Sequence, residues 1–249
     1  MTYDFTGKTA LVTGSTSGIG RATADKLAAA GARLIISGRD ITRGQAAVAA
    51  IRQAGGTADF VAVELSDASS VRQLIAWALE LGGGHVDILV NNAGVFPFGP
   101  TVDVTDEQID SVAAINVKAP FLLVAGLAPA MIAQGSGAIV NISTMVANFG
   151  MPGMALYGSS KAALQLLTKA WAAEFGGHGV RVNAVSPGPT RTEGTAGMGE
   201  GLDQLAATTP AGHPGAATDI ADAIVFLVSD SARHIHGAVL PVDGGRLAV

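Results

Sequence analysis

Short apolar runs alternate with longer helix-like segments from one end of the chain to the other. The apolar runs have the length of β-strands and are rich in Val, Ile and Leu. They fall at Ala10–Thr13, Arg33–Ser37, Phe60–Glu64, Ile88–Asn91, Ala138–Ser143, Arg181–Val185 and Val239–Val242. The predicted helices between them begin near Ile19, Ile41, Ala68, Asp106, Met154 and Asp219.

In the central strands the apolar residues are consecutive rather than alternating, as in Ile88–Asn91 and Ala138–Ser143. Strands of this kind are buried on both faces, as in parallel sheets that helices cover. The pattern therefore predicts an α/β fold, a doubly wound parallel sheet of about seven strands with helices on both faces. No linker-like stretch divides the chain, so we expect one domain over residues 1–249.

Composition and charge narrow the possible functions. The 249 residues are 49% hydrophobic and 14% charged, which is enough apolar material for a large core. Cysteine is absent, so disulfides, a thiol nucleophile and zinc–cysteine sites are excluded. The net charge of -5 argues against a nucleic-acid partner. The histidines are scattered, and only His234 and His236 could share a strand face, so no metal site is expected.

The sequence shows no clear membrane-spanning segment and no clear signal peptide. The longest apolar stretch, Ala119–Ala133, is interrupted by Pro120 and Pro129 and is too short to span a bilayer. Residues 1–8 lack the basic region and apolar run of a signal peptide. We therefore expect a cytoplasmic protein without a membrane partner.

The glycine-rich segment TGSTSGIG, residues 13–20, lies between the first predicted strand and the first predicted helix. Glycines at such a junction let the backbone approach a pyrophosphate at the helix N-terminus, where free N–H groups favour negative charge. On its own, the turn could equally serve packing.

A second motif lies near the other end of the chain, where Tyr157 and Lys161 are four residues apart. On a helix they share one face, and an ammonium next to a phenol favours ionisation of the phenol. A nucleotide cradle together with an activated phenol indicates redox chemistry on a carbonyl group.

In this order, with the motifs between them, the two segments resemble the short-chain dehydrogenase/reductase family. The resemblance runs from Gly7 to Gly245 and implies a Rossmann-like, NAD(P)-binding domain. It also implies that Tyr157 is the general acid or base, that Lys161 lowers the pKa of Tyr157 and holds the nicotinamide ribose, and that Asn116 organises a proton-relay water. In the family a serine polarises the carbonyl thirteen residues before the tyrosine, and here that position is Thr144.

Two neighbouring hydroxyls are therefore candidates. Ser143 lies one residue earlier, where strand geometry should turn it to the opposite face. We expect Thr144 to be the active hydroxyl, with Ser143 as the alternative. Pro120, which lacks an N–H, should leave the carbonyl of Asn116 free to hold water, unless it only kinks the helix.

The resemblance also implies a set of cofactor-binding residues. They are Gly14, Ser15, Ser17, Gly18, Ile19, Gly20, Arg39, Glu64, Leu65, Asn91, Ala93, Gly94, Tyr157, Lys161, Pro187, Gly188, Thr190 and Thr192.

Cofactor choice depends on the end of the second strand. Gly38 stands where NAD-preferring relatives usually have Asp, and Arg39 can form bidentate bonds to a 2′-phosphate. Asp40 is expected to N-cap the next helix instead. We therefore predict NADP(H), with NAD(H) as the alternative.

The glycine-rich stretch 193–215 is long for a connection and follows the Pro187–Thr192 segment, so we expect a substrate lid. Together these features predict an NADPH-dependent carbonyl reductase or alcohol dehydrogenase, and a 3-oxoacyl-[acyl-carrier-protein] reductase is compatible with them. The rival of another class is a dinucleotide-binding sensor without turnover. The resemblance further implies a homotetramer formed through long helices.

Overall fold

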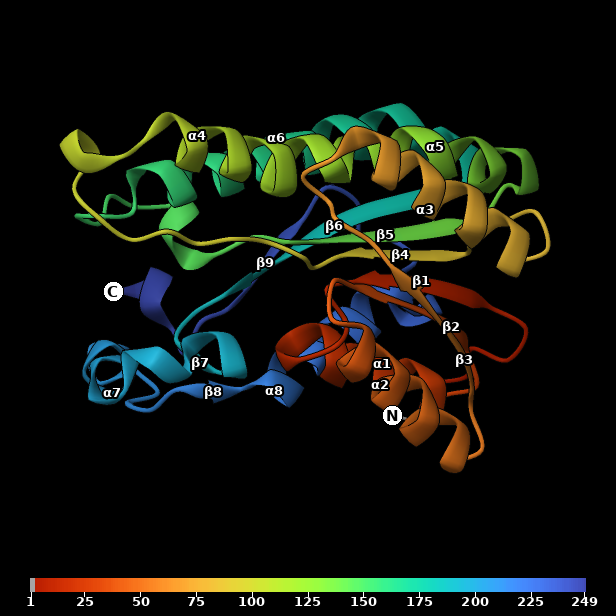
Figure 1. The fold of residues 1–249 in the computed structure, drawn as a ribbon, viewed down its shortest axis with the longest axis horizontal. Coiled ribbons are helices and arrows are strands. Elements are labelled where there is room, and N and C mark those ends of the chain that lie inside the picture. The colour runs from red at the N-terminus through yellow and green to blue at the C-terminus, as the bar shows by residue number, and fades with distance from the viewer. Residues whose placement is uncertain (1–2) are drawn as a thin grey trace.

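Seven parallel strands form the central sheet of the computed structural model, which describes residues 3–249. Their order is β3-β2-β1-β4-β5-β6-β9 (Figure 1), and every neighbouring pair is parallel. The strands are β1 (Thr9–Thr13), β2 (Arg33–Gly38), β3 (Thr57–Ala62), β4 (Ile88–Asn91), β5 (Gly137–Ile142), β6 (Val180–Pro187) and β9 (Val239–Val242). The predicted doubly wound fold is therefore confirmed.

Helices cover both faces of the sheet, and each face has its own apolar core. One face carries α1 (Gly18–Ala29), α2 (Ile41–Gln53) and α8 (Ala217–Val228), and the other carries α3 (Ala68–Leu81), α4 (Asp106–Val112), α5 (Ala119–Gln134) and α6 (Ala155–Phe175). Leu34 and Ile36 point to the first core and Leu11 and Ile35 to the second, because successive strand residues face opposite sides.

The third strand begins earlier than the sequence predicts. The expected range was Phe60–Glu64, whereas β3 spans Thr57–Ala62 and pairs with β2 along its whole length. Its first residues are partly polar, which hides the strand in the sequence. Asp59 is accommodated at this sheet edge by ion pairs with Arg33 (2.6 Å) and Arg52 (3.0 Å).

A continuous helical run from Asp106 to Gln134 contains the irregularity that Pro120 suggests. Thr105 and Gln108 form a capping box at its start. Residues Ala113–Lys118 adopt a π-helix, and π-turns are common at functional sites. This turn directly precedes Pro120, which cannot donate the ordinary helical bond to the carbonyl of Asn116.

The same run is long and apolar enough to cross a membrane by length and composition alone. The prediction that no apolar stretch reaches this length considered only Ala119–Ala133. Half of the tested window is buried, and Leu123, Leu127 and Met131 belong to the second core. Packing against the sheet accounts for its apolar character.

The glycine-rich stretch after β6 is largely helical, contrary to the irregular loop that its composition suggests. It contains a 3₁₀ helix, Glu193–Met198, and α7 (Glu200–Ala206), separated by Gly199 at φ +51°. The short strands β7 (Thr190–Arg191) and β8 (Gly215–Ala216) pair with each other and fix the two ends of the segment. Figure 1 shows α7 close to the C-terminus.

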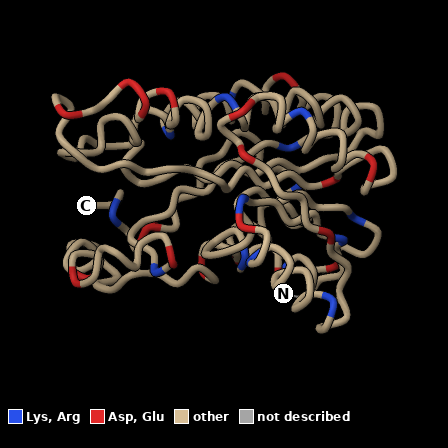
Figure 2. Tube along the Cα trace, viewed as in Figure 1, with Lys and Arg blue, Asp and Glu red and all other residues tan. Residues whose placement is uncertain are grey.

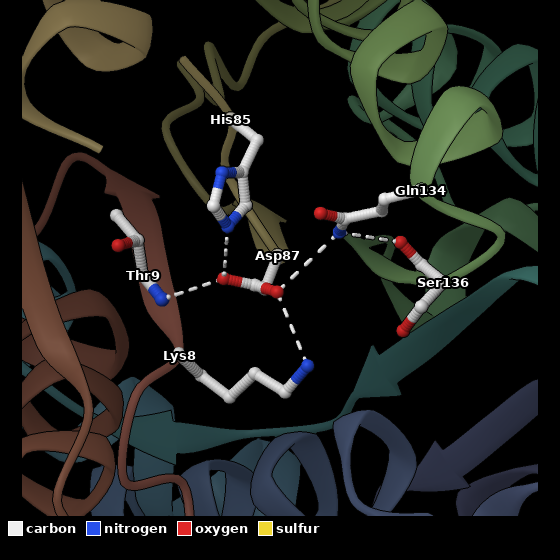
Figure 3. Close-up of polar contacts among 6 residues, drawn as sticks. All are labelled: Lys8, Thr9, His85, Asp87, Gln134 and Ser136. Carbon is white, nitrogen blue, oxygen red and sulfur yellow. Dashed lines mark hydrogen bonds and ion pairs between the residues drawn. The ribbon is translucent and has the colours of Figure 1, made fainter. Parts of the chain in front are cut away.

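A buried carboxylate joins three strands near their amino ends (Figure 3). Asp87, just before β4, accepts hydrogen bonds from the backbone N–H of Thr9 (2.9 Å) and from Lys8 Nζ (3.2 Å). Its own carbonyl accepts from the N–H of Ala138 in β5, and His85 Nε2 lies 3.5 Å from the carboxylate. The cluster thus lies at the amino ends of the strands, opposite the carboxyl ends, where the functional site lies.

Candidate active site

A cavity of about 830 Å³ lies along the carboxyl ends of the strands. Residues that directly follow β1, β2, β3, β4 and β5, and residues at the end of β6, line it, and the 193–206 segment closes one side. The strand order reverses at β1 and β4, and ligands of open α/β sheets bind at such a point. The cavity therefore lies at the position where open α/β sheets bind their ligands.

The glycine-rich turn between β1 and α1 leaves room for a ligand but none for side chains. Gly14 and Gly18 have φ of +62° and +54°, which residues with a side chain rarely adopt. A Cβ on Gly20 would lie 2.4 Å from Asn92 Nδ2, which donates to the carbonyls of Thr13 (2.8 Å) and Gly14 (3.1 Å). The turn thus brings the N-terminus of α1 to the cavity wall, a cradle that fits a dinucleotide phosphate.

Most of the predicted site residues line this cavity. They are Gly14, Ser17, Gly18, Ile19, Arg39, Glu64, Leu65, Ala93, Gly94, Ser143, Thr144, Tyr157, Lys161, Pro187, Gly188, Thr190 and Thr192. Four others, Ser15, Gly20, Asn91 and Asn116, do not line it.

Those four residues hold the walls from behind. The Ser15 hydroxyl donates to the Val12 carbonyl (2.6 Å) and Asn91 Nδ2 donates to Asn141 Oδ1 (2.8 Å). The Ser15 hydroxyl is therefore engaged within the fold, whereas the buried Oδ1 of Asn91 has no hydrogen-bond partner among the described residues.

The outer end of the cavity carries opposite charges. Arg39 is mostly exposed, and its guanidinium lies 3.8 Å from the carboxylate of Glu64. Asp40 caps α2 as expected by accepting from the N–H of Arg43 (2.9 Å). Arg43 also lines the cavity and was missed, as were Thr16 and Asn92. The position of Arg43 one helical turn after Arg39 could have indicated that both arginines reach the same site.

Lys161 is buried at the inner end of the cavity. Its Nζ donates to the carbonyl of Ile142 at the end of β5 (2.8 Å), and burial lowers the pKa of Lys161 to about 8. A Cβ on Gly94 would lie 3.2 Å from both Lys161 Nζ and Asn116 Oδ1. A side chain at position 94 would therefore press on both groups, and the glycine leaves them room.

Tyr157 differs from the expectation that a nearby ammonium favours its ionisation. Burial raises the pKa of Tyr157 to about 12, and a side-chain hydrogen bond with Thr144 acts in the opposite direction without cancelling the effect. Lys161 instead directs its ammonium to a carbonyl oxygen. The phenol is therefore protonated at neutral pH, the form that donates a proton.

The two candidate hydroxyls have different partners. Thr144 interacts with the phenol of Tyr157. The hydroxyl of Ser143 accepts from Gln165 Nε2 (2.9 Å) and donates to the Lys161 carbonyl (3.4 Å), so it is engaged with α6.

Asn116 lies in the π-turn and is fully buried. Its Oδ1 accepts from the N–H of Val95 (2.9 Å), and its Nδ2 donates to the Val95 carbonyl (2.9 Å) and to Ser160 Oγ (3.0 Å). The side chain therefore fixes the strand-to-loop segment after β4, next to Lys161.

Beyond Tyr157 the cavity wall is apolar. Phe96, Met145, Val146, Met151 and Met154 line this part of the cavity. Phe98 and Leu156 line a separate hollow near α4. The side chains of Met198, Leu202 and Leu205 from the 193–206 segment complete the wall.

A dinucleotide cradle that leads to a partly buried tyrosine and a buried lysine defines an oxidoreductase of CH–OH and C=O groups. A family model described as enoyl-(acyl carrier protein) reductase matches residues 14–246. The chain is 47% identical to a solved short chain dehydrogenase/reductase family protein, with a TM-score of 0.90 and full coverage of both chains. The protein belongs to the short-chain dehydrogenase/reductase family.

Two further relatives are of the same kind. The chain is 39% identical over 240 residues to a 2,5-dichloro-2,5-cyclohexadiene-1,4-diol dehydrogenase of Sphingobium indicum, covering 96% of each protein. It is 36% identical to a short chain dehydrogenase from Burkholderia cenocepacia solved in complex with NADP, with a TM-score of 0.90 and coverage of 97% and 98%.

Proposed function

We propose that the protein is an NADP(H)-dependent carbonyl reductase, which also runs in reverse as an alcohol dehydrogenase. The observation that carries this proposal is the partly buried Tyr157 one helical turn from the buried Lys161 at the inner end of the dinucleotide cavity. The bound cofactor supplies or accepts the hydride at nicotinamide C4. Oxidation of NADPH in the presence of a ketone, followed by absorbance, tests the proposal, and absence of turnover with every ketone would favour the dinucleotide-binding sensor.

The side chains have separate roles in this proposal. Tyr157 donates its phenolic proton to the carbonyl oxygen during reduction, and Thr144 polarises that oxygen with its hydroxyl. Lys161 holds the nicotinamide ribose and returns the proton to Tyr157. Asn116 acts as a positioning residue, because its side chain anchors Val95, and its carbonyl, to which Pro120 cannot donate, suits a relay water.

The glycine-rich turn and the segments after the other strands hold the cofactor. The N-terminus of α1 at Gly18 and Ile19 takes the pyrophosphate, and Arg39 and Arg43 flank the place of the 2′-phosphate. The similarity to the NADP-bound dehydrogenase of Burkholderia cenocepacia supports the choice of cofactor.

Arg39→Ala should reduce the preference for NADPH over NADH by about 10- to 100-fold in kcat/KM, the size of one charged hydrogen bond. The Arg39 side chain is mostly exposed and its contact with Glu64 is long, at 3.8 Å, so the guanidinium can turn to a phosphate. Arg72→Ala, which removes an arginine outside the cavity, is the matched control and should leave the ratio unchanged. Equal kcat/KM for both cofactors in the wild type would contradict the assignment.

Glu193→Gln should tighten NADPH binding about two- to fivefold. The Glu193 carboxylate accepts from the N–H of Gly18 (2.9 Å) at the start of α1, where the phosphate is expected. Two anions compete for one helix N-terminus, and the amide removes that competition while keeping the shape. Fluorescence titration measures the change, Glu200→Gln on the same segment is the control, and a weaker affinity of Glu193→Gln would show that Glu193 instead helps to retain the cofactor.

We further propose that the chain works in the cytoplasm as a homotetramer. Phe121 on α5 and Leu166 on α6 are exposed apolar residues on the two long helices, and they suit contacts between subunits. Light scattering should give the mass of four chains, whereas a stable monomer at micromolar concentration would contradict the proposal.

The alternative substrate is a 3-oxoacyl group on a carrier protein. Its phosphopantetheine arm carries a phosphate, which basic residues at the cavity mouth would recognise. The 193–215 segment has no Lys or Arg, so this alternative is less well supported than reduction of a small ketone.

A further inference from the structure

The substrate end of the cavity differs from the cofactor end in its chemistry. The charged residues that line the cavity are Arg39, Asp40, Arg43, Glu64 and Lys161. The first four follow β2 and β3 at the outer end, and Lys161 is bound to the Ile142 carbonyl. Past Tyr157, none of the described lining residues carries a charge.

The wall beyond Tyr157 is built from large apolar side chains. Phe96 packs edge-on against Tyr157, with ring centroids 6.1 Å apart. Four of the six methionines of the chain line the cavity, namely Met145, Met151, Met154 and Met198. Unbranched thioethers adapt to the shape of an apolar ligand, so this wall can close around a bulky hydrocarbon group.

Polar side chains on this side are already bonded within the fold. The hydroxyl of Thr195 donates to the carbonyl of Thr190 (2.7 Å). Thr144 interacts with the phenol of Tyr157, and the proposed function assigns both groups to the reacting oxygen. A polyhydroxylated substrate would therefore bury hydroxyl groups without partners, which costs about 1–3 kcal/mol for each unpaired group.

The segment that covers this wall is acidic. Residues 193–215 contain Glu193, Glu200 and Asp203 and no Lys or Arg. Figure 2 shows acidic positions on this part of the chain at the same end as the C-terminus. Arg246 lies with its guanidinium 4.8 Å from the ring centroid of Phe149 and is absent from the cavity lining. Anionic substrates thus meet acidic side chains at the mouth and find no cation in the described wall beyond Tyr157.

We infer that the substrate is an uncharged ketone or secondary alcohol whose larger flank is a hydrocarbon group, and that sugar acids and polyols are rejected. This inference rests on the proposed function, because it assigns Tyr157 and Thr144 to the carbonyl oxygen. It adds that Phe96 and the four methionines contact the larger flank of the substrate and determine which flanks are accepted.

Matched ketones test the inference on the full-length enzyme with NADPH. The first pair is 2-heptanone and 6-oxoheptanoate, which differ only in a terminal methyl against a carboxylate. The second pair is 2-butanone and the trihydroxylated four-carbon ketone erythrulose. We expect kcat/KM to rise about fourfold per methylene from 2-butanone to 2-heptanone. The anionic and polyhydroxylated members should be at least about 100-fold poorer than their partners.

A charge introduced into the wall should reverse part of this preference. Met198 is half-exposed, so Met198→Lys can fold normally, and it should raise kcat/KM for 6-oxoheptanoate relative to 2-heptanone by about tenfold or more. Val102→Lys adds the same charge at an exposed position outside the cavity and should leave the ratio unchanged.

Binding is measured separately, by saturation-transfer NMR of each ketone on the enzyme with NADPH. Binding of 2-heptanone without turnover would contradict the proposed function and support the apolar site. Turnover of erythrulose or 6-oxoheptanoate at or above the rate of its partner would overturn the inference and leave the proposed function intact. Absence of both binding and turnover for 2-heptanone would contradict the two together.

Discussion

Tyr157→Phe should lower kcat for ketone reduction by about 10²- to 10⁴-fold, the contribution of a positioned general acid. The substitution removes one hydroxyl and keeps the ring that packs against Phe96. Burial holds the phenol in its protonated form, so the variant loses a group that is ready to donate. NADPH binding, measured by fluorescence titration, should change little.

Two comparisons make this result specific. Tyr3→Phe removes the other tyrosine hydroxyl of the chain, outside the cavity, and should leave kcat unchanged. Lys161→Ala should weaken both turnover and cofactor binding, since the ammonium serves the ribose and the proton path. If Tyr157→Phe keeps more than about a tenth of the wild-type kcat, the general acid is a different group.

Thr144→Val should lower kcat by about 10²- to 10³-fold, because it removes one donor to the developing oxyanion while keeping the shape. The assignment rests on the contact between Thr144 and Tyr157, in contrast to the Ser143 hydroxyl, which is engaged with Gln165 and the Lys161 carbonyl. Ser143→Ala should therefore change kcat only a few fold.

Thr144→Ser completes the series, since it restores the hydroxyl and removes a methyl from the pocket. It should retain activity, and all variants are compared on a single ketone. A severe loss in Ser143→Ala with a mild one in Thr144→Val would assign the polarising role to Ser143.

The strands and the motif positions could be predicted from the sequence because they depend on local patterns. Consecutive apolar residues identify strands that are buried on both faces, and the glycines of residues 14–20 identify a close backbone approach. The predicted start of β3 was wrong because Asp59 is paired with arginines from other elements. A local sequence pattern does not contain such long-range ion pairs.

The contacts of the site depend on residues far apart in the chain. The hydrogen bond between Glu193 and Gly18 joins positions 175 residues apart. The sequence near either residue does not predict this bond. The burial of Asn116 similarly follows from how the π-turn packs against the Gly94–Val95 segment and Ser160. The direction of the Tyr157 pKa was missed for the same reason, because neighbouring charge was weighed without the desolvation that the fold imposes.

The central claim is that this cavity transfers a hydride to a ketone carbon under the control of Tyr157. The most direct measurement uses NADPH deuterated at nicotinamide C4, prepared in each of the two configurations, with 2-heptanone as the substrate. We predict that one configuration places deuterium on the carbinol carbon of 2-heptanol in the wild type, and that Tyr157→Phe forms this labelled product at least about 100-fold more slowly. Formation of 2-heptanol without deuterium from either labelled cofactor would contradict the account.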